Sequence, residues 1–209
     1  METKKLAVIE TLAEGLKIGL KNLPSLILAT LLWVLTIWIP YLNVGTTIAM
    51  QTIPGRLAKG EIISPLFIFE SKYRRDIAGF LLLFAFVYFT TYMAGLFMLI
   101  PAIVVSYALS LAFYIFVDED VNAIEALRLS NKATYGNKWN LFFIGMMYLL
   151  LVVAVTAVLV ALTYKVTWLC VLICIALALV CVAAGLGIDA VIYNELYLKE
   201  KASNEPAAE

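Results

Sequence analysis

Four stretches of this sequence are almost wholly apolar, and each is long enough to cross a lipid bilayer. A helix needs ~20 residues to cross a hydrocarbon core of ~30 Å, and the runs of this length are Leu23–Leu42, Ile77–Ile100, Trp139–Leu162 and Val166–Ile192. A fifth run, Pro101–Val117, is shorter but adequate if it is little tilted. Hydrophobic residues make up 64% of the chain and charged residues only 14%, so a soluble domain could not bury the apolar surface. The sequence therefore predicts an all-α membrane protein.

The segment Asn43–Lys59 decides the predicted topology, because it is only moderately apolar. It contains Gln51, Pro54 and several threonines. If this segment crosses the membrane, every basic residue except Lys165 falls on one side, as expected for the cytoplasmic side. We therefore predict six transmembrane helices arranged as three hairpins, with both termini in the cytoplasm and the chain in the bacterial inner membrane. Residues 1–201 would form one membrane domain, with spans at about 23–42, 43–59, 77–100, 101–117, 139–162 and 166–192, and residues 202–209 a disordered tail.

A predicted amphipathic helix precedes each hairpin. The first of these helices is expected in Glu10–Lys21. An apolar stripe, formed by Leu12, Leu16 and Leu20 together with the preceding Ile9, lies opposite a charged one. This 3.6-residue period is typical of a helix that lies in the membrane interface. We expect similar cytoplasmic helices in Ser64–Arg75 and in Asn122–Tyr135, where Asn122 is the expected N-cap and Gly136 the expected stop.

Polar side chains within the spans are the candidates for a cavity at the centre of the bundle. Polar groups in lipid must find partners, and broken helices often line cavities. The same side chains could instead form hydrogen bonds between helices that only hold the bundle together. Asp189 would then form a salt bridge, with Arg56 or Arg128 as the partner, or lie at the membrane interface near the cytoplasmic end of its span. The candidate cavity residues are Thr47, Gln51, Thr91, Ser106, Ser110 and Asp189.

The sequence predicts no catalytic group, cofactor or metal site. It has no histidine, and it lacks the G-x-S-x-G, H-E-x-x-H and phosphate-loop motifs, which excludes a Ser/His hydrolase. Cys170, Cys174 and Cys181 share one face of a single apolar helix and are interpreted as packing residues. The acidic strip Asp118–Asp120 is interpreted as a charge cluster at a helix start rather than a cation site. The net charge is zero, and no concentrated basic face suggests nucleic-acid binding.

Residues Gly60 to Leu150 and their surroundings carry a recognisable pattern. A basic helix end is followed by Gly-Glu, a hairpin turns at Pro101 in LIPAIVVSYALS, and the strip Asp118–Asp120 precedes the helix AIEALRLS…YGNKW. In these features the chain resembles the uncharacterised bacterial integral membrane proteins related to the glycerophosphoryl diester phosphodiesterase membrane domain. The resemblance implies a six-helix inner-membrane module and no particular reaction. The sequence departs from the family's usual Pro-Gly at the hairpin turn, because Ala102 follows the proline.

Two functions are compatible with these patterns. The first is a non-enzymatic protein that binds or organises membrane lipids or envelope partners, with anionic headgroups contacted by Lys72, Arg74, Arg75 and Lys138. The second is a small transporter or channel that uses the Thr47–Gln51 stripe and Asp189 as a path. The expected partners are lipids and either a second copy of the chain or other membrane proteins.

Overall fold

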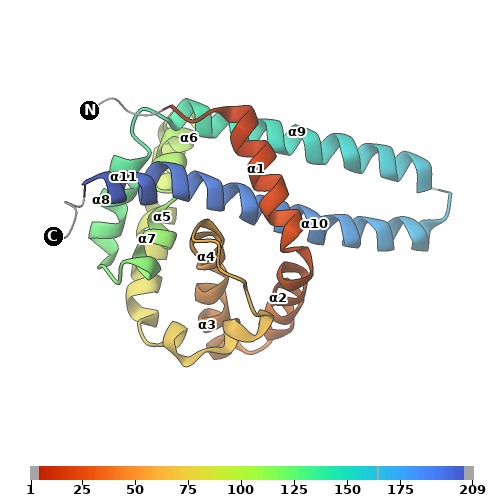
Figure 1. Ribbon diagram of the computed structural model, residues 1–209, viewed down its shortest axis with the longest axis horizontal. Helices are drawn as coiled ribbons and strands as arrows, with labels where there is room; N and C mark the ends of the chain where they lie inside the picture. The colour runs from red at the N-terminus through yellow and green to blue at the C-terminus, as the bar shows by residue number, and fades with distance from the viewer. Residues whose placement is uncertain (1–4, 164, 205–209) are drawn as a thin grey trace.

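The computed structural model describes residues 5–163 and 165–204, and most of these residues are helical (Figure 1). The first part of the chain contains helices α1 to α4 and two 3₁₀ turns: α1 (Val8–Lys21), α2 (Leu23–Thr36), α3 (Pro40–Gln51), α4 (Ile53–Ala58), η1 (Pro65–Phe69) and η2 (Ser71–Arg74). The rest of the chain contains α5 (Ile77–Phe97), α6 (Leu99–Ala108), α7 (Ala112–Asp118), α8 (Ala123–Ala133), α9 (Lys138–Thr163), α10 (Thr167–Tyr193), the π-helical turn η3 (Asn194–Leu198) and α11 (Lys199–Asn204). Within the described residues no strand is present, in agreement with the predicted all-α class.

Four helices are long and apolar enough to cross a membrane. They are Ile77–Phe97, Leu99–Asp118, Lys138–Thr163 and Thr167–Ser203, and they coincide with four of the six predicted spans. A fifth candidate exists only if α1 and α2, which meet at an angle of 75°, are taken as one broken span. Alone, the 14 residues of α2 reach ~21 Å, less than the ~30 Å of a hydrocarbon core.

The second predicted span, Asn43–Lys59, does not form one long helix. The structure divides it into α3 and the short helix α4, which begins at Ile53 with Pro54 in its first turn. Much of this segment is buried by protein, including Thr46, Ile48 and Ile53. Its threonines and its proline therefore lie mainly against other helices.

Helix α1 packs closely on α10, and glycines make this approach possible. A Cβ atom on Gly187 would lie 2.2 Å from the carbonyl oxygen of Gly15 and 2.6 Å from the amide nitrogen of Gly19. Thr11 and Leu12 are buried on the same side of α1. Leu12 is part of the predicted apolar stripe, but the other residues of the stripe are not buried. Ile9 and Leu20 remain 73% and 52% exposed, so the stripe faces away from the protein.

The second predicted amphipathic helix, Ser64–Arg75, is wrong as an α-helix. The structure has the two short 3₁₀ turns η1 and η2 there, interrupted at Glu70. Phe67, Ile68 and Tyr73 are buried, so this segment is anchored by single apolar side chains rather than by a helical stripe. Long runs of 3₁₀ helix are uncommon because their hydrogen-bond geometry is poorer, which is consistent with the short turns.

In the third predicted segment the structure has a helix, α8, with Asn122 and Gly136 at its two ends as expected. The side chain of Asn122 accepts a hydrogen bond from the Glu125 amide at 2.9 Å, and Gly136 adopts a positive φ of 82° after the helix.

The hairpin expected to turn at Pro101 turns slightly earlier, at the extended residue Met98, and Pro101 lies in the first turn of α6. Of the predicted disordered tail, residues 202–204 belong to α11, and the remainder lies outside the described residues.

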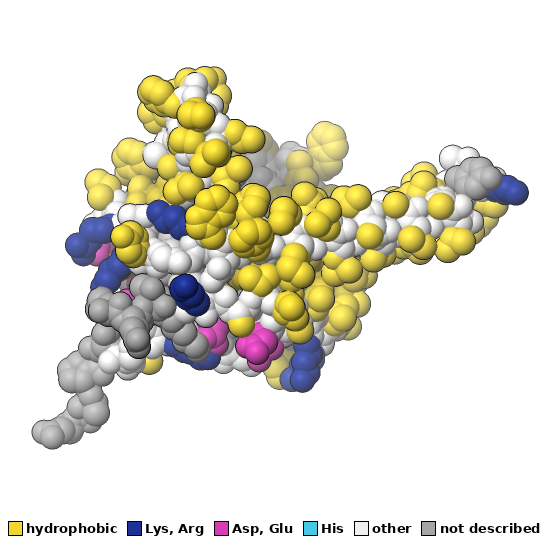
Figure 2. Space-filling model, turned by 90° about the horizontal axis from the view of Figure 1, so that it is seen from above, with side chains coloured by type: hydrophobic (Ala, Val, Ile, Leu, Met, Phe, Trp, Pro, Cys, Tyr) yellow, Lys and Arg dark blue, Asp and Glu magenta, His cyan; other side chains and the backbone are white. Residues whose placement is uncertain are grey.

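The predicted compact bundle is only partly present. Figure 1 shows α9 and α10 projecting together beyond the other helices as a long antiparallel pair. Side chains along this pair are exposed, including Leu149, Leu162 and Leu172. Hydrophobic side chains cover the projecting pair, whereas most charged side chains gather over the body of the molecule (Figure 2). Such a large apolar surface is typical of contact with lipid.

Candidate functional site

The candidate span Leu99–Asp118 is broken in its middle, and helix α8 satisfies backbone groups that the break leaves free. The helix stops at Ala108 and resumes at Ala112. The amide of Leu111 donates to the hydroxyl of Ser130 at 3.2 Å, and this hydroxyl donates to the carbonyl of Ala108 at 2.9 Å. Thr134 donates to the same carbonyl at 3.3 Å. Non-helical backbone at membrane depth requires partners of this kind inside the protein.

A cavity of about 340 Å³ lies beside this break, between α6, α7, α9 and α10. Its polar lining consists of one carboxylate and four hydroxyl groups, and the rest of its wall is apolar or glycine. The hydroxyl of Tyr114 donates to a carboxylate oxygen of Asp189 at 3.0 Å. The other polar residues of the lining are Tyr107, Ser110 and Tyr148. This cavity, which we call the Asp189 cavity, contains two of the residues that the sequence analysis selected, Ser110 and Asp189.

The salt bridge expected for Asp189 is absent. Arg56 lies 3.8 Å from Glu61, and Arg128 forms a 2.7 Å ion pair with Glu125 on its own helix. Among the described residues, Tyr114 is the hydrogen-bonding partner of the Asp189 carboxylate. The prediction of a basic partner was therefore wrong for residues 5–163 and 165–204, none of which supplies a countercharge to this carboxylate.

The other predicted cavity residues lie elsewhere. Thr47 accepts a hydrogen bond from the Trp33 indole at 3.0 Å, which joins α2 to α3. Thr91 and Gln51 are half-buried, and neither lines the Asp189 cavity. Ser106 is exposed, and its hydroxyl donates to the carbonyl of Ile103 on its own helix at 2.9 Å. For Thr47, the interpretation as a bond between helices is the correct one.

A larger pocket, of about 640 Å³, lies where α4, η2 and α7 approach one another. We call it the charged pocket, because its wall carries four cations and four carboxylates. These are Arg56, Lys59, Lys72 and Arg75, and Glu61, Asp76, Asp118 and Asp120. Two of the predicted lipid contacts, Lys72 and Arg75, are thus brought together with Arg56 and Lys59, which were not selected as lipid contacts from the sequence.

Most carboxylates of the charged pocket have partners within the protein. Asp118 pairs with Lys59 and accepts a hydrogen bond from Tyr193 at 2.9 Å. Asp76 caps α5 by accepting from the Gly79 amide at 2.9 Å. Lys72 bonds to Glu70 at 2.7 Å, which raises the pKa of its ammonium group and keeps it charged. Arg75 is exposed and has no ion pair among the described residues, so it is available to a ligand.

The remaining predicted lipid contacts do not belong to this pocket. The side chain of Arg74 packs against Gly45 of α3, and a Cβ atom added to Gly45 would lie 2.6 Å from the arginine Cγ. The Arg74 guanidinium donates a hydrogen bond to the Phe69 carbonyl at 3.4 Å. Lys138 is half-buried at the start of α9 and donates to Asn131 at 3.3 Å. These two side chains serve local packing in the structure.

The acidic strip Asp118–Asp120 begins at the last residue of α7 instead of starting a helix. Asp118 pairs with Lys59, and Glu119 pairs with Lys201 at 2.6 Å. Among the described residues no group of three or more carboxylate or cysteine side chains could hold a metal ion. The three cysteines are free thiols in α10, and each is half-buried.

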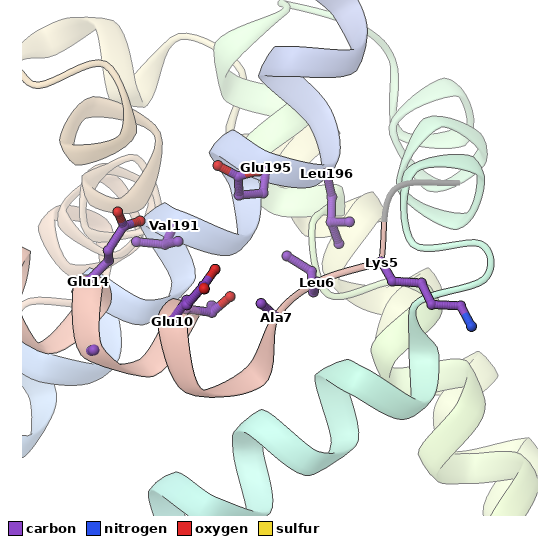
Figure 3. Close-up of a pocket in the computed structure, with 10 residues that line it drawn as sticks. Lys5, Leu6, Ala7, Glu10, Glu14, Val191, Glu195 and Leu196 are labelled. Atoms are coloured by element: carbon purple, nitrogen blue, oxygen red, sulfur yellow. The ribbon is translucent and has the colours of Figure 1, made fainter. Parts of the chain in front are cut away.

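A third pocket, of about 430 Å³, lies between the start of α1 and the end of α10. In Figure 3 the carboxylates of Glu10, Glu14 and Glu195 line this pocket, and Lys5 points away from them. Glu195 forms an ion pair with Lys199. Lys199 thus balances part of this acidic surface.

Sequence reasoning missed several residues of the two central sites. Tyr148 contributes to the Asp189 cavity from α9, and its only sequence signal is a hydroxyl within an otherwise apolar run. Ser130 and Thr134 form hydrogen bonds to the backbone at the helix break. They share one face of α8 at a spacing of four residues. That spacing predicts a shared face, but not the break that the face covers.

No family model, curated protein or solved structure that was compared with this chain matches it.

Proposed function

We propose that this chain is a multi-pass protein of the bacterial inner membrane that binds phospholipid headgroups in the charged pocket. Four long apolar helices support residence in a membrane. The distribution of basic residues supports an orientation with the charged pocket and both ends of the chain on the cytoplasmic side. The resemblance to the membrane-domain family described above remains a prediction.

The observation that carries this proposal is the free guanidinium of Arg75 beside Lys72 on the wall of the charged pocket. Guanidinium groups bind phosphate through paired hydrogen bonds. In the part of the chain just before Lys72, the side chains of Ile62 and Leu66 are 93% and 67% exposed. Apolar side chains beside a phosphate-binding cation suit the interface between headgroups and acyl chains.

The balance of charge in the pocket favours a particular kind of headgroup. Because four carboxylates accompany the four cations, the pocket has no large positive field to attract anionic lipid. A zwitterionic headgroup can place its phosphate near Arg75 and its ammonium group near a carboxylate such as Asp120. We therefore propose phosphatidylethanolamine as the preferred lipid, in place of the anionic lipid expected from the positive charges alone.

The test is the stabilisation of the purified protein by added lipid. In a maltoside detergent, saturating phosphatidylethanolamine should raise the unfolding temperature of the wild type, because a ligand at 100 times its Kd stabilises the folded state by about 2.7 kcal/mol. Arg75→Gln should remove most of this increase. Lys138→Gln, outside the pocket, is the matched control and should keep it.

Two outcomes would contradict the proposal. Equal stabilisation of the wild type and Arg75→Gln would show that the pocket does not hold the phosphate. Stronger stabilisation by phosphatidylglycerol than by phosphatidylethanolamine would keep a phosphate site but reject the zwitterionic preference.

A transporter is the second candidate, and the broken span beside the Asp189 cavity favours it. Discontinuous helices and intramembrane carboxylates are common along transport paths. Flux in liposomes should then fall strongly in Asp189→Asn. It should be unchanged in Gln51→Leu, because Gln51 does not line the cavity. Equal flux in wild type and Asp189→Asn would exclude this path.

A further inference from the structure

The Asp189 cavity combines a carboxylate that lacks a countercharge with aromatic walls. The two hydrophobic helices α9 and α10 contribute much of its lining, including Leu141, Ile144 and Ile188. A carboxylate in such surroundings is unfavourable unless a cation or a proton neutralises it. No lysine or arginine of the described residues lies within ion-pair distance of Asp189, so the protein itself does not provide the cation.

The lining has the composition that recognises an organic ammonium group. The aromatic residues Tyr107, Tyr114 and Tyr148 surround the cavity together with the carboxylate. Aromatic rings attract cations through their negative faces, and a neighbouring carboxylate adds a full countercharge. The remaining wall is apolar, and apolar walls suit the alkyl groups of an amine.

The cavity fits neither a bare metal ion nor a proton alone. Hard metal ions need about six oxygen ligands, whereas this lining has a single carboxylate and a few hydroxyl groups. Its volume of about 340 Å³ lies at the lower end of the range for small-molecule pockets. A proton would neutralise Asp189 but would leave this space unexplained.

From this geometry we propose that the Asp189 cavity is a binding site for a small organic ammonium ion, with Asp189 as the countercharge and Tyr107, Tyr114 and Tyr148 as its aromatic wall. The site shares Tyr114 with the charged pocket, but Asp189 lines only the Asp189 cavity and Arg75 lines only the charged pocket. The Tyr114 hydroxyl, which donates to Asp189, orients the carboxylate.

Equilibrium dialysis of the full chain with radiolabelled tetraethylammonium tests the proposal directly. The protein is kept in a nonionic maltoside, which contains no ammonium group. We expect saturable binding that unlabelled tetraethylammonium displaces and that neutral N,N-diethylacetamide does not. Asp189→Asn keeps the size of the side chain and should weaken binding by at least about tenfold. Glu125→Gln, an acid-to-amide change outside the cavity, should bind like the wild type.

A second pair of variants keeps the test informative if Asp189→Asn does not fold. Tyr148→Phe retains the aromatic ring and should bind within about threefold of the wild type, whereas Tyr148→Leu should bind about three- to tenfold more weakly. An absence of saturable binding to the wild type overturns the proposal and leaves Asp189 as a protonated group. Equal binding by wild type and Asp189→Asn overturns it as well. Because Arg75→Gln should bind tetraethylammonium normally, failure of lipid binding and failure of this site are distinguishable.

The source of the ammonium group is decided by a further arm of the same experiment. Adding short-chain phosphatidylcholine supplies the ammonium as part of a lipid headgroup. If it displaces tetraethylammonium from the wild type, the cavity accepts a headgroup. If it does not, the cavity accepts a free amine.

Discussion

At the scale of single residues, the closest contact between elements depends on the absence of side chains. Gly187 of α10 meets the backbone of Gly15 and Gly19 of α1, and nothing larger than hydrogen fits between them. Gly15 and Gly19 were not selected from the sequence as a contact, because the apolar stripe of α1 suggested a different buried face.

We expect Gly187→Ala to destabilise the packing of α1 on α10. The new Cβ would lie 2.2 Å from a backbone oxygen that cannot move aside, and overpacking of this kind costs about 1–3 kcal/mol. The free energy of unfolding in detergent measures the effect. Gly185→Ala is the matched control, since its nearest neighbour is the Tyr148 ring at 3.7 Å. A similar loss in both variants would mean that helix propensity, and not the contact, sets the cost.

At the scale of elements, the break between α6 and α7 depends on a helix that is distant from it in the sequence. Ser130 bonds to the chain on both sides of the break, at Ala108 and Leu111. The break places Ser110 at the cavity, and an unbroken helix would carry that residue to a different position. The Asp189 cavity is therefore a product of the α7–α8 contact.

Ser130→Ala should lower the free energy of unfolding by about 1–3 kcal/mol. The buried amide of Leu111 would lose its partner, and an unsatisfied buried donor carries this cost. Ser106→Ala serves as the control, because Ser106 is exposed and bonds only within its own helix. If both substitutions proved equally mild, water must replace the serine at the break.

The pair α2–α3 is the element whose role in the membrane the sequence leaves open. Thr36 and Thr46 form a 2.7 Å hydrogen bond between the two helices. Trp38, in their connection, and Tyr41, in the first turn of α3, are 88% and 69% exposed. Aromatic residues of this kind concentrate at membrane interfaces. A hairpin that crosses and one that enters and leaves on the same side give the same distribution of basic residues, so charge alone does not separate them.

At the scale of the whole molecule, labelling of single cysteines in a cysteine-free background tests the topology. A membrane-impermeant thiol reagent should label Tyr41→Cys and Lys165→Cys from outside intact cells. It should label Arg75→Cys only after permeabilisation, because we propose that the charged pocket lies on the cytoplasmic side. Labelling of Lys165→Cys without Tyr41→Cys would make α2–α3 a re-entrant hairpin. Labelling of Arg75→Cys from outside would reverse the proposed orientation.

The sequence by itself determined the helical class and four of the apolar helices, because the length and the composition of a run are properties of that run alone. The caps of α8 were predictable for the same reason, since Asn122 acts on an amide only three residues away. The division of Asn43–Lys59 into two helices, the 3₁₀ turns and the break at Leu109–Leu111 depend on contacts with distant residues.

The candidate site was predictable only in part. Asp189 and Ser110 were visible as polar groups in apolar runs, but their meeting in one cavity required the packing of four helices. Lys72 and Arg75 were visible as charges, whereas the neighbouring carboxylates became part of their pocket only through folding. Hydrogen bonds and ion pairs act over only a few ångströms. Their partners can be more than a hundred positions apart in the sequence, so folding decides which polar groups meet.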